Sequence, residues 1–300
     1  MEEKIKEVKN LINSYFNEID SEFFKNFVDD FSFGKMLRSK LILTIAPKET
    51  LNIKLCGIIE LIHFASLLHD DVIDSSYMRR GNISINAKHG DKNAIMLGDI
   101  LYSKAFYEVS CISKDLSKII SNAVLMLSIG ELEDVELSKS FNLDSNKYIK
   151  MINNKTASLI EAAAVCAGIL SNKGINKYKI YGNSLGIAFQ IIDDLLDITK
   201  ETSTLGKESF SDLKEGKTTL PYIYLYNKMK DDEKNKLLSY FKKDLKQNDK
   251  TWIKEKIEKY NIINEIQNVA LNYGKMALDT LDKEDYKLKE IIKDMIYREF

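Results

Sequence analysis

The sequence contains few of the residues that interrupt helices or join separate domains. Its 300 residues include only two prolines, Pro47 and Pro221, and 13 scattered glycines. No stretch is rich in proline, glycine and serine together, so no segment has the composition of a flexible linker. We therefore predict a single domain that extends over residues 1–300.

Cysteine is equally scarce. Cys56, Cys111 and Cys166 are far apart and lie in apolar stretches. This pattern is atypical of a disulfide framework or a zinc site, and we expect three reduced core residues of a cytoplasmic protein. The charged N-terminal stretch lacks the apolar region of a signal peptide, and no apolar run is as long as a membrane span.

No charge of one sign dominates, because 44 basic and 45 acidic residues give a formal net charge of −1. The chain therefore has no global field that would attract nucleic acid or an anionic membrane surface. We expect no nucleic acid partner and at most peripheral membrane contact. Apolar residues make up 44% of the chain, enough for a sizeable core. An anionic ligand would need a local cluster of cations.

Apolar residues recur at i, i+3, i+4 and i+7 almost throughout, whereas alternation of period two is scarce. This pattern predicts an all-α fold. The stretches near 55–75, 157–170 and 183–199 are apolar on nearly every face, which is typical of helices inside a bundle. The predicted helices lie around 11–16 and at about 55–75, 93–112, 117–139, 145–170, 175–199 and 219–229, followed by four shorter ones.

Two of these apolar helices end in the pattern Asp-Asp-x-x-Asp. On a helix, the first and last aspartates of this pattern project from one face, one turn apart. Carboxylates in apolar surroundings are costly unless a cation neutralises them, and Mg²⁺ prefers such oxygen ligands. We therefore predict two Mg²⁺-binding motifs, formed by Asp70, Asp71 and Asp74 and by Asp193, Asp194 and Asp197. Asp29-Asp30 and Asp231-Asp232 lack the third aspartate and are expected at the surface.

Basic residues recur near both aspartate motifs. Each of them alone is more often a solvated surface charge. Together they form a set of cations that suits a phosphorylated substrate, with arginine able to bind phosphate through two bonds. The set consists of Lys35 and Arg38 after Gly34, Arg79 and Arg80 after the first motif, Lys155 before Thr156, and Lys207 and Lys217 after the second motif.

His63 lies two turns before the first motif, and Glu60-x-x-His63 is half of a carboxylate di-iron pattern. A di-iron bundle needs a second such pair, but neither His69 nor His89 has an acidic residue three positions earlier. A di-metal redox or storage bundle is therefore disfavoured. A hydrogen-bonded core histidine is the simplest alternative role for His63.

Taken in order, these motifs resemble the trans-isoprenyl diphosphate synthase (polyprenyl synthetase) family over essentially the whole chain. The resemblance implies a single large orthogonal helical bundle around a central cavity, the isoprenoid synthase fold, usually as a homodimer. The stretch 62–70 looks most like the long-chain octaprenyl and heptaprenyl diphosphate synthases. The motifs include Gly34-Lys35-x-x-Arg38, the two aspartate motifs, Met78-Arg79-Arg80-Gly81, Gly98-Asp99, Lys155-Thr156, Phe189-Gln190 and Gly206-Lys207.

The resemblance also implies a reaction and a role for each residue. Isopentenyl diphosphate would be joined head-to-tail to an allylic diphosphate such as farnesyl or geranyl diphosphate, with about three Mg²⁺ ions bound beside the substrate. Asp70, Asp74 and Asp193 would ligate Mg²⁺, with Asp71, Asp194 and Asp197 in support. The allylic diphosphate would contact Arg79, Lys155, Lys207 and Lys217; isopentenyl diphosphate would contact Lys35, Arg38, His63 and Arg80; Thr156 and Gln190 would line the reaction centre.

The chain departs from the family at the glycine-rich stretch, where Gly-Gly-Lys-Arg-x-Arg-Pro is usual. Met36 replaces the middle arginine and Ser39 replaces the proline, so the local geometry here is expected to differ. The two basic residues expected to touch phosphate, Lys35 and Arg38, are retained.

In the resembling family, product length depends on the residues one turn before the first aspartate of the first motif, here Asp70. Ala65 and Ser66 are small, which in the resembling family lets the growing chain pass and predicts a long-chain product, such as a quinone side chain. Alternatively, small residues here merely allow close helix packing. Other functions left open are a short-chain farnesyl or geranylgeranyl diphosphate synthase, a class I terpene cyclase and a non-catalytic partner subunit.

Overall fold

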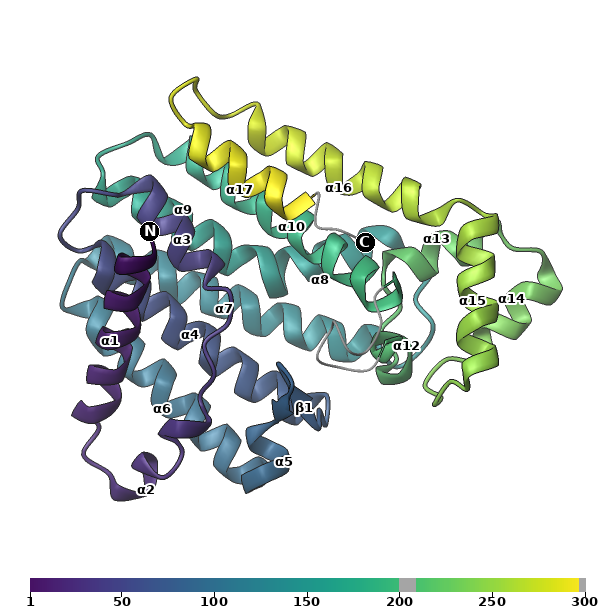
Figure 1. Cartoon of the computed structure of the whole chain (residues 1–300), viewed down its shortest axis with the longest axis horizontal. Helices are drawn as coiled ribbons and strands as arrows, with labels where there is room; N and C mark the ends of the chain where they lie inside the picture. Colours follow the sequence, from purple (N-terminus) through teal and green to yellow (C-terminus); the bar gives the residue numbers. More distant parts are fainter. Residues whose placement is uncertain (200–208, 297–300) are drawn as a thin grey trace. The chain divides into compact units, whose positions relative to one another are not determined.

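Helices account for nearly all regular structure in the computed structural model, which describes residues 1–199 and 209–296 (Figure 1). Within these ranges the only sheet is a two-stranded hairpin. The prediction of an all-α fold is confirmed. Most long helices lie where the apolar periodicity placed them, because a 3.6-residue repeat puts one apolar face on a helix.

Two compact units can be distinguished from the internal contacts of the chain. Unit 1 comprises residues 1–125, 159–182 and 282–288, and unit 2 comprises residues 126–158, 183–281 and 289–300. Neither unit is one continuous stretch, and α7 (Lys114–Leu137), α10 (Ile175–Thr199) and α17 (Tyr286–Ile296) contribute to both. The single-domain organisation stays a prediction.

Unit 1 is built on α4 (Asn52–Ile73), along which α6 (Asp91–Ser110), α1 (Glu2–Glu18) and α3 (Leu37–Ile45) pack. Successive residues such as Ile58, Ile59, Leu61 and Ile62 are fully buried, as expected for a helix apolar on every face. The remaining elements are α2 (Glu22–Lys25), the short 3₁₀ helix η1 (Val28–Asp30), β1 (Met78–Arg79), β2 (Asn82–Ile83), α5 (Ile85–His89) and α9 (Ser158–Leu170).

A tight hairpin follows α4 and carries the two arginines of the first motif region. Met78 pairs with Ile83 and Arg79 with Asn82 in antiparallel register. Arg80 (φ 53°) and Gly81 (φ 79°) form the turn, and two successive positive φ values match a type I′ hairpin turn. A left-handed arginine costs about 1 kcal/mol, so tertiary contacts of Arg80 must hold it there.

Unit 2 has its core around α10, α13 (Leu220–Lys228), α15 (Gln247–Lys259) and α16 (Ile262–Leu278). The stretch predicted as one helix over 145–170 contains an interruption. The π-helical turn η2 (Asn153–Ala157) separates α8 (Ser145–Ile152) from α9. Such turns often mark functional positions, and this one carries Lys155 and Thr156. The other elements are α12 (Ser211–Glu215) and α14 (Asp231–Leu238).

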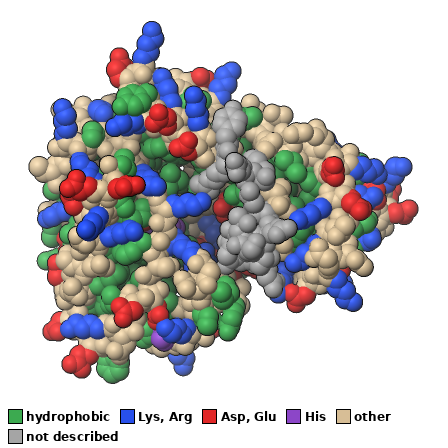
Figure 2. All heavy atoms as spheres, viewed as in Figure 1, with side chains coloured by type: hydrophobic (Ala, Val, Ile, Leu, Met, Phe, Trp, Pro, Cys, Tyr) green, Lys and Arg blue, Asp and Glu red, His purple; other side chains and the backbone are tan. Residues whose placement is uncertain are grey.

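The visible surface mixes basic and acidic side chains without a field of one sign (Figure 2). Within the described ranges, no helix combines the length and the apolarity needed to cross a bilayer. All three cysteines are free thiols. Cys56 and Cys166 are buried as expected, but Cys111 is exposed because it caps the C-terminal end of α6, where the chain turns.

Candidate active site

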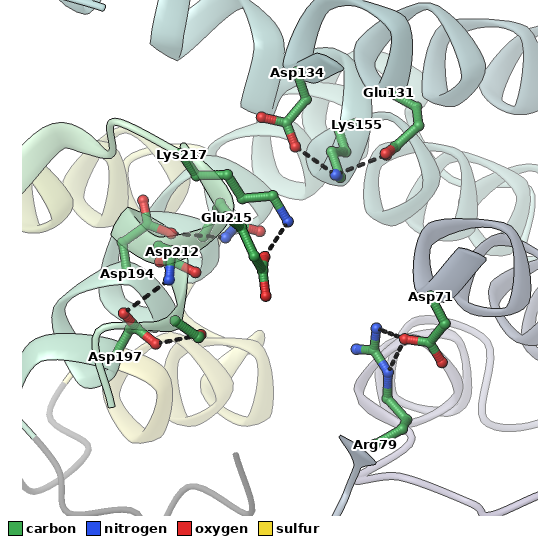
Figure 3. A network of polar contacts seen from close by, with 12 residues as sticks. Asp71, Arg79, Glu131, Asp134, Lys155, Asp194, Asp197, Asp212, Glu215 and Lys217 are labelled. Atoms are coloured by element: carbon green, nitrogen blue, oxygen red, sulfur yellow. Dashed lines mark hydrogen bonds and ion pairs between the residues drawn. The ribbon is translucent and has the colours of Figure 1, made fainter. Parts of the chain in front are cut away.

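The first aspartate motif lies at the C-terminal end of α4, with Asp74 as the C-cap, and its members differ in burial. Asp71 is buried and accepts a hydrogen bond from Arg79 Nε at 2.9 Å, while a second guanidinium nitrogen of Arg79 contacts the same oxygen (Figure 3). Burial raises the pKa of Asp71, and the bond from Arg79 opposes this shift. Asp70 and Asp74 are half-buried, one turn apart.

Three arginines of unit 1 lie near enough to His63 for their charges to act on it. Burial lowers the pKa of His63 well below 6.5, and the positive charges of Arg38, Arg80 and Arg79 lower it further, in that order. Arg80 donates to the backbone oxygen of Ser32. We call Arg38, Arg79 and Arg80 the arginine cluster. Like charges held this close favour an anion between them.

Arg38 is the member whose hydrogen-bonding capacity is least used. Its Nε is inaccessible to solvent and has no hydrogen-bond partner in the described part of the chain. Burial lowers the pKa of Arg38 to about 10, the Glu60 carboxylate raises it and Arg80 lowers it. An inaccessible donor without a partner is costly, so the surrounding structure must hold this side chain in place. Lys35, three residues earlier, is exposed.

The second aspartate motif lies near the C-terminal end of α10. Asp193 is exposed, whereas Asp194 and Asp197 are buried. Asp197 accepts from Ser211 Oγ at 2.8 Å and from the Asp212 amide at 3.4 Å. Thus the three aspartates assigned a supporting role, Asp71, Asp194 and Asp197, are the three buried ones.

Asp194 terminates a chain of hydrogen bonds that begins at the π turn. Thr156 Oγ1 donates to Gln190 Oε1 at 2.8 Å, and Gln190 Nε2 donates to Asp194 Oδ1 at 2.9 Å. The buried hydroxyl of Tyr148 donates to the other oxygen of Asp194. Burial raises the pKa of Asp194 well above its usual range, Asp212 adds to the shift, and the bonds from Tyr148 and Gln190 oppose it.

Lys155 is held between two acidic side chains of α7. Its Nζ lies 2.7 Å from Glu131 Oε2 and 2.7 Å from Asp134 Oδ2 (Figure 3). Gly130 permits this approach, since a Cβ there would lie 2.6 Å from Lys155 Cα. Sequence reasoning missed Glu131 and Asp134 because they precede Lys155 by 24 and 21 positions; their i, i+3 spacing on one helix face was the available signal.

The remaining predicted site residues are placed as follows. Lys217 is half-buried and pairs with Glu215 at 2.8 Å. Lys207 lies outside the described residues. Ala65 and Ser66 are buried on α4, and Ser66 Oγ donates to the backbone oxygen of His63 at 2.9 Å. Asp29 is exposed and Asp231 is 96% exposed, as expected. The prediction was wrong for Asp30, which is 22% exposed because Lys88 and His89 pair with its carboxylate.

A closed metal centre is not preformed in the described ranges, where no three His, Cys, Asp or Glu side chains converge on one point. The carboxylates present still suit Mg²⁺, which binds through one or two carboxylates together with water and substrate phosphates. The crowding of Asp193, Asp194 and Asp212, which raises the pKa of Asp194, is a charge arrangement that a cation would relieve.

Comparison with known proteins gives consistent results. A family model described as polyprenyl synthetase matches residues 22–259. Octaprenyl diphosphate synthase of Escherichia coli K12 is 39% identical over 202 residues, which span 64% of this chain and 62% of that protein, less than two thirds of its length.

Two solved structures are similar over almost the whole chain. Octaprenyl pyrophosphate synthase from Helicobacter pylori is 45% identical, with a TM-score of 0.95 over 99% of this chain and 100% of the other. Polyprenyl synthase from Caulobacter crescentus, crystallised with calcium and isoprenyl diphosphate, is 27% identical, with a TM-score of 0.92 over 100% of this chain and 96% of the other.

Proposed function

Because this chain belongs to the polyprenyl synthetase family, we propose that it joins isopentenyl diphosphate to an allylic diphosphate such as farnesyl or geranyl diphosphate. The observation that supports this most directly is the arginine cluster, three positive charges within unit 1 that all act on the buried His63. This arrangement suits a diphosphate group. The proposed enzyme is a Mg²⁺-dependent trans-prenyltransferase.

The unit 1 residues would bind isopentenyl diphosphate. Arg38 and Arg80 would contact its phosphates, with exposed Lys35 reaching the same anion and His63 beside it. A neutral His63 can donate one hydrogen bond to phosphate without adding a fourth positive charge. Arg79, already paired with Asp71, would contact the allylic diphosphate near Asp70 and Asp74.

The unit 2 residues would act on the allylic substrate. Lys155 and Lys217 would contact its diphosphate, together with Lys207, which lies outside the described residues. Thr156 donates its only hydroxyl hydrogen to Gln190, so its oxygen lone pairs remain available for a neighbouring carbocation. The orientation of Gln190 is set by its bond to Asp194.

Asp70, Asp74 and Asp193 would hold Mg²⁺, which would supply positive charge opposite the departing diphosphate. Asp71, Asp194 and Asp197 would support these ligands through their hydrogen bonds. Apolar walls would shield the allylic cation from water until the alkene of isopentenyl diphosphate attacks it. This attack forms the new C–C bond and leaves a second cation. Loss of a proton, which we assign to the released diphosphate as acceptor, then forms the new double bond.

We propose a long-chain product, as the small residues Ala65 and Ser66 and the two octaprenyl synthase relatives support. A quinone side chain is a suitable use for it. We also propose a cytoplasmic homodimer. An exposed apolar stripe along α7 favours a second copy of the chain, with exposed fractions of 57%, 36%, 71% and 38% for Leu125, Ile129, Leu132 and Val135.

The direct test incubates the purified protein with Mg²⁺, labelled isopentenyl diphosphate and farnesyl diphosphate, and sizes the extracted products. Linear long-chain diphosphates are expected. A parallel incubation with geranyl diphosphate as primer separates the alternatives. Farnesyl diphosphate from the geranyl primer, or geranylgeranyl diphosphate from either primer, as the end product would indicate the short-chain alternative. Cyclic hydrocarbons would indicate a terpene cyclase, and no product from either primer a non-catalytic partner subunit.

A double-mutant cycle tests whether both aspartate motifs serve one reaction step. Asp70→Asn and Asp193→Asn should each lower kcat by about 10³-fold, and the double variant should fall by far less than the product of the two losses. Asp231→Asn, at a 96% exposed aspartate, is the matched control and should keep wild-type activity. Losses that multiply in full would refute a shared role.

A further inference from the structure

The start of α3, which carries Arg38, lacks the usual means of ordering a helix N-terminus. Its N-cap residue, Met36, has left-handed backbone angles (φ 50°, ψ 45°) and makes no side-chain capping bond in the described chain. The first amides of any helix have no partner within the helix. In a helix of nine residues, such an end would normally fray.

Glu60 of α4 supplies the missing acceptor. Its Oε1 accepts a hydrogen bond from the Ser39 amide at 3.2 Å and another from Ser39 Oγ at 2.6 Å. Glu60 is 3% exposed and Ser39 is fully buried. A buried carboxylate is tolerated only where donors satisfy it, and a negative charge at a helix N-terminus is favourable. These two bonds therefore fix the third residue of α3 to the side of α4.

The two bonds between Ser39 and Glu60, which we call the anchor, lie next to Arg38, the residue proposed to bind the diphosphate. Arg38 directly precedes Ser39, so fixing the Ser39 backbone also fixes where the Arg38 side chain begins. Glu60 and His63 are three positions apart on one face of α4, which brings the anchor and the arginine cluster together. The Glu60 charge also offsets the repulsion between Arg38 and Arg80, because Glu60 raises the Arg38 pKa whereas Arg80 lowers it.

Ser39 is one of the two departures from the family pattern, in which proline is usual at this position. A proline has neither an amide hydrogen nor a hydroxyl group and could make neither bond to Glu60. We propose that Glu60, acting through Ser39, is a positioning residue that holds Arg38 for the diphosphate of isopentenyl diphosphate. This inference rests on the proposed function, and it assigns Glu60 a role outside any di-iron site.

The test separates the two substrates kinetically. Glu60→Ala and Ser39→Ala should each raise the KM for isopentenyl diphosphate by about tenfold, because a cation displaced by a fraction of an ångström binds phosphate less well. The KM for the allylic diphosphate and kcat should stay within about twofold of wild type. Glu60→Gln should largely restore the KM, since its amide oxygen can accept both bonds.

Ser171→Ala is the matched control. Ser171 Oγ donates to the backbone oxygen of Ile45 at 3.2 Å, so this variant perturbs the opposite end of the same helix. It should lower thermal stability slightly and leave both KM values unchanged. If Glu60→Ala fails to fold, Ser39→Ala, which loses only a hydroxyl group, supplies the answer.

Calorimetric titration with isopentenyl diphosphate tests the proposed function and the positioning role of Glu60 separately. If the wild-type protein binds none, the proposed function is wrong. If it binds, and Ser39→Ala and Glu60→Ala bind equally well, the positioning role of Glu60 is wrong. Equal increases in both KM values would likewise assign Glu60 to general stability alone.

Discussion

Gly130 offers a sharp test of how the Lys155 segment is positioned. In Gly130→Ala, the new Cβ would lie 2.6 Å from Lys155 Cα, 2.8 Å from the Asn154 carbonyl carbon and closer still to the Lys155 amide nitrogen. Ordinary contacts of this kind begin at 3.4 Å. The obstacle is backbone, so no side-chain rotation relieves it, and the π turn must move away from α7.

The size of the effect follows from that geometry. The required shift is about 1 Å, and a misplacement of this size in a catalytic group lowers turnover by about 10²-fold. The strain costs about 1–3 kcal/mol, but alanine gains about 1 kcal/mol over glycine in a helix. The net loss of stability should therefore be at most about 2 kcal/mol. A large loss of kcat with a modest fall in Tm is the expected signature.

The assay measures kcat at saturating concentrations of both substrates and, in parallel, the thermal unfolding midpoint. Gly174→Ala is the control, because a Cβ at Gly174 would meet nothing within 4 Å. It should leave both quantities unchanged. If Gly130→Ala kept kcat within about threefold of wild type while remaining folded, close approach of α7 would not position Lys155 and Thr156 as argued.

Three further variants test separate features. Ala65→Phe should shorten the largest product seen by chromatography; unchanged product length would mean that Ala65 serves only helix packing. Tyr148→Phe removes the hydroxyl that donates to Asp194 Oδ2 and should lower kcat by about tenfold. The control Tyr181→Phe loses a hydrogen bond to the Leu288 backbone oxygen and should lower only stability. Equal kcat values for the two variants would contradict the role of Tyr148. Burial and the arginine cluster hold the pKa of His63 in the folded protein well below 6.5. The neutral form of His63 therefore contributes stability that is present above pH 6.5. This contribution is lost as the pH falls through the folded-state pKa. His63→Gln should flatten this loss in thermal unfolding measured below pH 6.5, and an unaltered profile would assign the pH dependence to other groups.

The long helices could be predicted because the spacing of apolar residues along each one indicates which faces are buried. α4 and residues 183–199 of α10 are apolar on nearly every face, and the structure buries most of their side chains. α3 and the hairpin at 78–83 were not predicted. α3 has only nine residues and no capping side chain, and its start is ordered by Glu60, which lies 21 positions after Ser39. Order that depends on a distant residue leaves no local pattern.

The site residues follow the same division. The aspartate motifs and the basic residues were recognisable because their spacing is short and repeated. The partners of Lys155, the bond from Tyr148 to Asp194 and the π turn were not, since each depends on contacts between segments far apart in the sequence. Within each motif the buried and the more exposed aspartates cannot be distinguished from the sequence pattern. Their burial depends on the helix face on which each one lies and on the elements packed against that face.

The residues around His63 and the residues around Asp194 differ in the sign of their excess charge in the folded protein. Around His63, the arginine cluster adds to burial in lowering the histidine pKa, so the local field is positive. Around Asp194, Asp212 and Asp193 add to burial in raising the carboxyl pKa, so the local field is negative. Like charges held in a low-dielectric interior repel strongly, and a ligand of opposite sign converts that repulsion into binding free energy. An anion would relieve the repulsion in the first group and a cation that in the second, which supports the proposed diphosphate and Mg²⁺ ligands.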